Sequence, residues 1–211
     1  MIYCVGDSHV EVFYCVNNSQ LCSQKFEIYH MGPFLAYTVG DRGHENYQKT
    51  MKQISSFTLG SEILLSFGEI DCRAHILRQS EKRSVSVLSV VEEVVHIYEN
   101  IIRDVSDKGY KVIVWCPIAT ANVDCFEWND KAEFPRYGKA VVRNEITKHF
   151  CDCLLYSFKG HHNIHVISIL NHLLNENMTS KSEYYKKDGV HLAEAAVPVI
   201  ISEIEKQYSS I

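Results

Sequence analysis

Apolar runs alternate with amphipathic segments along the whole of this 211-residue chain. Five runs rich in strand-forming residues end at glycine or polar residues, as buried strands do. They cover residues 2–5, 26–31, 62–67, 110–118 and 163–169. Between them, apolar side chains recur every three or four positions, which predicts helices. These helices cover residues 11–15, 46–57, 85–107, 135–158 and 192–208.

The longest predicted helix, 85–107, carries one apolar stripe, and Gly109 is well placed to stop it. The run 110–118 has the continuous hydrophobicity of a strand covered on both faces. Pro198 lies within the last predicted helix, so either that helix is kinked there or its first turn is separate. Alternating strands and helices predict a parallel sheet with helices on both faces. No repeat or linker divides the chain, so residues 1–211 are predicted to form a single domain.

Charge and hydropathy limit the partners that this chain can have. The net charge is −5, the pI is near 6.1, and Lys and Arg are scattered, which argues against a nucleic-acid partner. No run approaches the ~18 apolar residues of a membrane span, and no leader precedes the first strand. We therefore expect a soluble, cytoplasmic protein with no membrane partner. The oligomeric state does not follow from the sequence.

The chain contains eight cysteines, and in a cytosolic protein these are expected to be free thiols. Cys151 and Cys153, followed by His161, His162 and His165, have the composition of a metal site. Their spacing differs from that of the usual zinc motifs, and the segment is predicted to run from helix through loop to strand. We predict no metal and no organic cofactor.

A candidate nucleophile lies where the first predicted strand ends, in the sequence Gly6, Asp7, Ser8, His9. Gly6 is expected to take an unusual backbone angle. The turn would leave Ser8 near a helix N-terminus, where free N–H groups and the helix dipole favour negative charge. Such a position suits a nucleophilic hydroxyl. Ser and Asp are also ordinary helix-capping residues, so this stretch alone does not distinguish catalysis from capping.

A candidate partner lies near the other end of the chain, where Asp188 precedes His191 by three residues. His191 would accept the Ser8 proton, and Asp188 would hold the imidazole tautomer. Four blocks of the chain together resemble the SGNH (GDSL-type) hydrolase superfamily, in the right order and over almost the whole length. They are Gly6-Asp7-Ser8-His9, Gly32, Gly68-Glu69-Ile70-Asp71 and Asp188-Gly189-Val190-His191.

The resemblance, with the handedness rule for parallel strands, implies a three-layer α/β/α fold. Its flavodoxin-like sheet would have five parallel strands in the order 2-1-3-4-5, with the site at their carboxyl ends. Family members are esterases, lipases, carbohydrate deacetylases and some acyltransferases, so the implied reaction is acyl transfer from an ester. Ser8 would be the nucleophile, and the N–H groups of Ser8 and Gly32 would face the oxyanion. Gly32 fits equally well as a turn glycine before Pro33.

The third block departs from the family pattern at Ile70, where the superfamily usually has an oxyanion-binding Asn. Losing such a donor costs about 10²–10³ in turnover. Arg73 is the candidate replacement, or would grip an anionic substrate group, with Glu69 and Asp71 positioning it. The alternative is that these charges form a salt-bridged loop. The predicted substrate-binding residues are Asp7, His9, Glu69, Asp71, Arg73 and His75.

These patterns lead to three hypotheses about function. The first is a serine hydrolase that cleaves a small or carbohydrate-borne acyl ester such as an acetyl ester. The second is an O-acyltransferase acting on a glycan, and the third is a catalytically degenerate binding module on the same fold. An aromatic group would either stack on sugar rings or pack locally; it comprises Phe126, Trp128, Phe134, Tyr137, Tyr184 and Tyr185.

Overall fold

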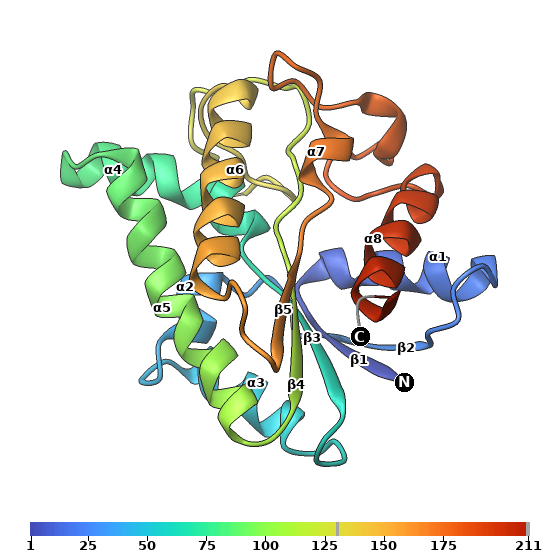
Figure 1. Ribbon diagram of the computed structural model, residues 1–211. Coiled ribbons are helices and arrows are strands. Elements are labelled where there is room, and N and C mark those ends of the chain that lie inside the picture. Colours follow the sequence, from blue (N-terminus) through green and yellow to red (C-terminus); the bar gives the residue numbers. More distant parts are fainter. Residues whose placement is uncertain (130, 210–211) are drawn as a thin grey trace.

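A computed structural model describes residues 1–129 and 131–209 (Figure 1). Its centre is a sheet of five parallel strands in the order β2-β1-β3-β4-β5, which confirms the predicted topology. The strands are β1 (Ile2–Gly6), β2 (Phe26–His30), β3 (Glu62–Ser66), β4 (Lys111–Trp115) and β5 (Ile164–Ile167).

Helices cover both faces of the sheet, which makes the three-layer fold (Figure 1). α1 (Val12–Ser19) and α8 (Val197–Ser209) pack together on one face. The other face carries α2 (Ala36–Gly40), α3 (Glu45–Ile54), α5 (Val87–Asp107) and α6 (Ala140–Ser157). α4 (Ile76–Arg83) and α7 (Leu170–Leu173) lie toward the carboxyl ends of the strands. The short turns are η1 (Ser8–Glu11), η2 (Asp71–His75, π-helical), η3 (Ser182–Tyr184) and η4 (Glu194–Ala196).

The longest helix shows how the apolar pattern is used. The stripe on α5 is buried from Val90 to Val105, and Gly109, at φ +94°, follows the helix end as predicted. At the other end of the chain, η4 is a separate turn and α8 begins at Val197. Pro198 therefore lies in the first turn of α8, where its missing N–H is not needed.

All five strands end at one edge, and the register there brings distant segments together. Gly6 pairs with His30 of β2 and with Ser66 of β3. The prediction of an unusual backbone angle at Gly6 was wrong, because its φ lies outside the left-handed region. The glycine is needed for space instead: a Cβ there would lie 2.3 Å from the Ser66 carbonyl oxygen. Gly32, at φ +95°, does require the glycine conformation.

Candidate active site

The turn after β1 presents Ser8 at the carboxyl edge of the sheet. Asp7 is the N-cap of η1, and its Oδ1 accepts a hydrogen bond of 2.9 Å from the His9 N–H. Ser8 is the first residue of η1 and is half-buried, whereas Asp7 is buried. The cap therefore fixes the backbone on both sides of the Ser8 hydroxyl.

A short hairpin before α8 carries the second half of the site. Tyr185 and Leu192 form an antiparallel bridge, and the Lys186 N–H donates to the His191 carbonyl at 2.8 Å. The Tyr185 hydroxyl donates to the Ala119 carbonyl, which ties the hairpin to the segment after β4. The turn from Lys186 to His191 places Asp188 and His191 side by side.

Ser8, His191 and Asp188 form one hydrogen-bonded chain. His191 Nε2 lies 2.8 Å from Ser8 Oγ, and His191 Nδ1 lies 2.9 Å from Asp188 Oδ2. With the ring proton on Nδ1, the imidazole donates to the carboxylate and accepts from the hydroxyl. The structure thus brings together two side chains that are 183 positions apart in the sequence.

Asp188 is held in its charged form. Partial burial acts to raise its pKa, but hydrogen bonds from the Val190 and His191 N–H groups and from the imidazole outweigh it and lower the pKa to about 2. A carboxylate that stays ionised orients the imidazole and stabilises an imidazolium.

Solved structures share this architecture over nearly the whole chain. A candidate acylhydrolase from Bacteroides fragilis matches with a TM-score of 0.64 at 13% identity, covering 99% of this chain and 86% of the other. A GDSL-like lipase from Bacteroides thetaiotaomicron matches with 0.62 at 12% identity, covering 99% and 87%. An acetyl xylan esterase matches with 0.56 at 12% identity, covering 98% and 99%.

The chain has the fold of the SGNH hydrolases. No model of a known protein family matches the sequence, and no curated protein sequence matches it either. The SGNH fold is therefore established by the arrangement of the backbone, and what the site can do is argued from its side chains.

The predicted oxyanion donors lie at the expected edge of the SGNH fold. Ser8 begins η1, and Gly32 follows β2 with its positive φ. Within the described residues, no hydrogen bond of the fold engages the N–H of Ser8 or of Gly32. Ile70, which stands in place of the family's Asn, is half-buried just before η2 and has no group to donate.

Arg73 does not have the environment predicted for an oxyanion donor or a substrate grip. Its side chain is 4% exposed, and its Nε donates to both Glu69 oxygens, at 2.7 and 3.0 Å. Its Nη1 donates to the Pro135 carbonyl. The alternative, an internal salt bridge, is what the structure contains.

Glu69 also binds His9, whose Nε2 lies 3.0 Å from Glu69 Oε2. Burial acts to raise the Glu69 pKa, but Arg73 and His9 outweigh it and lower the pKa to about 2. Burial acts to lower the His9 pKa, but Glu69 and Asp7 raise it overall. The three side chains form one buried ionic network, which argues against direct substrate contact by Glu69.

Asp71 and Asp7 are also too deeply buried to bind substrate as predicted, each being 1% exposed. Asp71 does not position Arg73: its Oδ2 accepts from the Ala36 N–H at 2.7 Å, so it caps α2. Burial raises the pKa of Asp71 to about 7 and also raises that of Asp7. Asp71 and His75 line a cavity of about 250 Å³ with residues of α2, α4 and α5.

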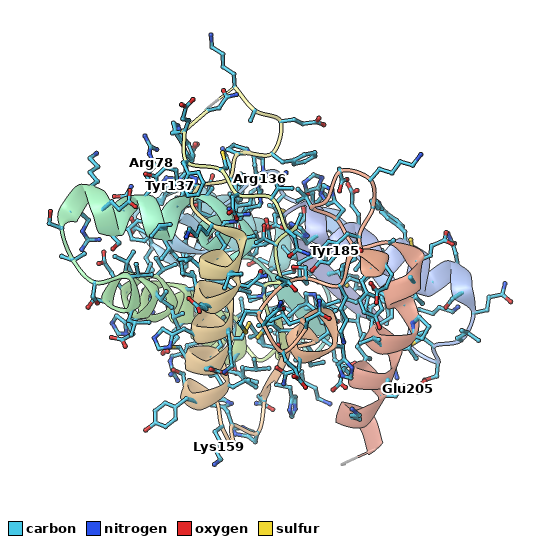
Figure 2. All side chains as sticks on the ribbon, turned by 90° about the horizontal axis from the view of Figure 1, so that it is seen from above. Arg78, Arg136, Tyr137, Lys159, Tyr185 and Glu205 are labelled. Carbon is cyan, nitrogen blue, oxygen red and sulfur yellow. The ribbon has the colours of Figure 1, made fainter. Side chains whose placement is uncertain are left out.

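The segment between β4 and α6 contacts the triad through Phe134. Phe134 meets the His191 ring edge-on, with centroids 5.2 Å apart, and Figure 2 shows the adjoining Arg136 and Tyr137 from above. Trp128 packs between His75 and the guanidinium of Arg78. Local packing thus accounts for most of the predicted aromatic group, while Phe126 is 64% exposed.

Among the described residues, no three His, Cys, Asp or Glu side chains lie so that they could hold a metal ion. Cys151 is buried near the Pro117 carbonyl, and Cys153 lies 3.7 Å from His149 Nε2. No helix among the described residues is long and apolar enough to cross a bilayer.

Sequence reasoning missed the contacts of Phe134 and Pro135 with the site. The aromatic composition of the loop was the only signal for Phe134. Pro135 contributes a backbone carbonyl, which leaves no signal in a sequence.

Proposed function

We propose that this protein is a serine ester hydrolase in which Ser8 is the nucleophile, His191 the general base and Asp188 the residue that orients the base. The observation that carries the proposal is the hydrogen-bonded chain of these three side chains, at 2.8 and 2.9 Å. Nucleophile, base and orienting acid in this arrangement are what acyl transfer through a serine requires.

The reaction follows from these positions. Ser8 Oγ attacks the ester carbonyl carbon while its proton moves to His191 Nε2, and the carbonyl electrons move to the oxygen. The N–H groups of Ser8 and Gly32 are the candidate donors to that oxyanion. Collapse of the tetrahedral intermediate breaks the ester C–O bond, and the leaving alkoxide takes the proton from His191. Water then attacks the acyl-enzyme by the same steps and releases the acid.

A small acyl group, such as acetyl, on a small molecule or a glycan suits the site best. The depression beside Ser8, which His9, Lys186 and His191 also line, is small. An acetyl xylan esterase is among the solved structures with this fold, which supports a carbohydrate-borne ester. Every group used in the mechanism belongs to this chain, so the proposed reaction needs no metal or organic cofactor.

Replacing Ser8 by alanine tests the proposal. Ser8→Ala should abolish hydrolysis of p-nitrophenyl acetate, because no other group can form the acyl-enzyme. The measurement is the release of p-nitrophenolate, together with covalent labelling by a fluorophosphonate probe. Circular dichroism shows whether the variant is folded. Ser23→Ala, which changes an exposed serine away from the triad, is the matched control.

Hydrolysis that survives in Ser8→Ala would refute the proposal. If the folded parent protein neither reacts with the fluorophosphonate probe nor hydrolyses p-nitrophenyl acetate, the result would instead favour the binding-module hypothesis. If the acetyl-enzyme formed from p-nitrophenyl acetate transfers its acetyl group to a sugar hydroxyl in preference to water, the same Ser8 chemistry serves an acyltransferase.

A further inference from the structure

The imidazole of His191 contacts two aromatic rings that come from different parts of the chain. The His9 ring lies 5.1 Å away, tilted by 32°. The Phe134 ring lies 5.2 Å away, nearly perpendicular at 79°. Asp188 bonds one nitrogen of the imidazole, and these two rings limit how far its plane can turn.

Both rings are connected to one buried ion pair. On one side, Glu69 Oε2 lies 3.0 Å from His9 Nε2. On the other side, Arg73 donates to the carbonyl of Pro135, the residue after Phe134. The Arg73 carbonyl also accepts a hydrogen bond of 3.1 Å from the Tyr137 N–H, so residues 135–137 are attached to Arg73 at two points.

We propose that the Glu69–Arg73 pair is a positioning clamp that holds the His9 and Phe134 rings against the His191 imidazole. The inference rests on the proposed function, because it takes His191 as the general base. Arg73 then acts through the loop that carries Phe134, and Glu69 acts through His9. The pair does not touch the reacting atoms.

The geometry of the pair explains why an arginine is required. The side chains of Glu69 and Arg73 are 5% and 4% exposed, so water screens their attraction little. The planar guanidinium reaches Glu69 with Nε and Pro135 with Nη1 at the same time. A lysine ammonium is a single point charge on a flexible stem and cannot hold both partners in fixed directions. The π-helical turn η2, a form frequent at functional sites, carries Arg73.

The base of the loop is fixed separately, so the clamp acts on its tip. Arg143 donates to the carbonyls of Gly138 and Val123, and Cys125 and Gly138 exchange backbone hydrogen bonds. The Asp124 carboxylate caps α6 by accepting from the Ala140 N–H at 2.8 Å. Release of Arg73 should therefore loosen residues 131–137 without unfolding the base of the loop.

The first test is Arg73→Lys in the full-length protein. The turnover number for p-nitrophenyl acetate should fall about 10- to 100-fold with little change in KM, because a misplaced base slows chemistry more than binding. In this variant, trypsin should cut faster after Lys131 or Arg136. Trypsin cleaves after both lysine and arginine, so an Arg→Lys substitution adds no cleavage site. Arg83→Lys is the matched control, since Arg83 pairs with Glu93 at the surface and should behave as the parent protein does.

Phe134→Leu supplies the second test and does not depend on the stability of Arg73→Lys. It should lower the turnover number at least 5-fold by removing one ring beside His191. In the double variant the two losses should not multiply, because both act on the same imidazole. Multiplying losses, or a Phe134→Leu variant as active as the parent protein, would overturn the clamp.

The proteolysis rate does not require catalysis, so it tests the clamp even if Ser8→Ala shows that the proposed function is wrong. An Arg73→Lys protein that is folded, fully active and as resistant to trypsin as the parent protein would also overturn the inference.

Discussion

Ile70 is the single position at which this chain departs most clearly from the SGNH pattern. A side-chain amide there would donate to the oxyanion in family members, and isoleucine has no donor. The clamp places Arg73 out of reach of this role, because its Nε and Nη1 already bond Glu69 and Pro135. In the proposed reaction, the backbone N–H groups of Ser8 and Gly32 would then be the oxyanion donors.

Restoring the amide should consequently increase activity. Ile70→Asn is expected to raise the turnover number for p-nitrophenyl acetate by about 10- to 100-fold, since one oxyanion donor is typically worth 10²–10³. Because Ile70 is half-buried, the polar side chain can be accommodated. Ile70→Leu, which keeps the size without a donor, is the control. An Asn variant no faster than the Leu variant would show that another group already binds the oxyanion.

Single residues differ in how far the sequence predicts their surroundings. Ser8, Asp188 and His191 lie in short ordered patterns, and the structure brings their side chains within hydrogen-bond distance. Arg73 lies in no such pattern. Its partners depend on the orientation of η2 and on the path of the loop that carries Pro135, which is 62 positions away in the sequence. Neither of these is encoded locally.

At the scale of elements, apolar patterns predict which segments are buried better than they predict where a strand or helix ends. The run 110–118 is buried except at Lys111, yet β4 stops at Trp115, where its partner β5 ends and just before Pro117, which has no N–H to donate. The helix predicted from residue 135 begins at Ala140, because Gly138 has a φ of +83°. Backbone pairing, rather than burial, decides these boundaries.

α2 shows why some elements escape prediction altogether. It has five residues, too few for a helical period, and its N-terminal N–H groups are capped by Asp71, which is 35 positions away from Ala36. α2 is held instead by α5. A Cβ on Gly40 would lie 2.1 Å from the Ile97 carbonyl oxygen, so the two backbones are in direct contact.

Gly40→Ala should therefore destabilise the protein through this one contact. Overpacking of this kind typically costs about 1–3 kcal/mol, and the expected loss in the free energy of unfolding is at the upper end because the obstructing atoms are backbone. Urea denaturation followed by circular dichroism measures it. Gly43→Ala, whose nearest atom is a side-chain oxygen at 3.4 Å, should change the free energy little. Equal stabilities for the two variants would contradict direct backbone packing of α2 on α5.

At the scale of the whole molecule, the buried ionisable groups set how stability depends on pH. Burial raises the pKa of Asp71 to about 7, so the folded state retains a proton that the unfolded chain releases near pH 4. The free energy of unfolding must fall between these pH values, by a limit of about 4 kcal/mol for a shift of about three units. Asp7 acts in the same direction, because burial also raises its pKa. His9 does so too, because its pKa is raised and its stabilising contribution is lost as the pH rises.

Glu69 and Asp188 act in the opposite direction, because their pKa values are lowered to about 2. Their stabilisation is complete above the unfolded values near pH 4 and is lost as the pH falls toward 2. Together, the contributions of these two sets of groups are greatest near pH 4–5 and decline on both sides.

The substitution Asp71→Asn tests whether ionisation of Asp71 causes the decline in the free energy of unfolding above pH 5. The amide oxygen can still accept the Ala36 N–H, but the side chain no longer titrates, so the loss of free energy between pH 4.5 and 7.5 should shrink by up to about 3 kcal/mol. Urea denaturation at pH 4.5, 6.0 and 7.5 gives that slope. Asp107→Asn, at an exposed position on α5, should retain the slope of the parent protein. If Asp71→Asn also keeps that slope, the buried carboxyl is ionised throughout, and the N–H groups of α2 outweigh its burial.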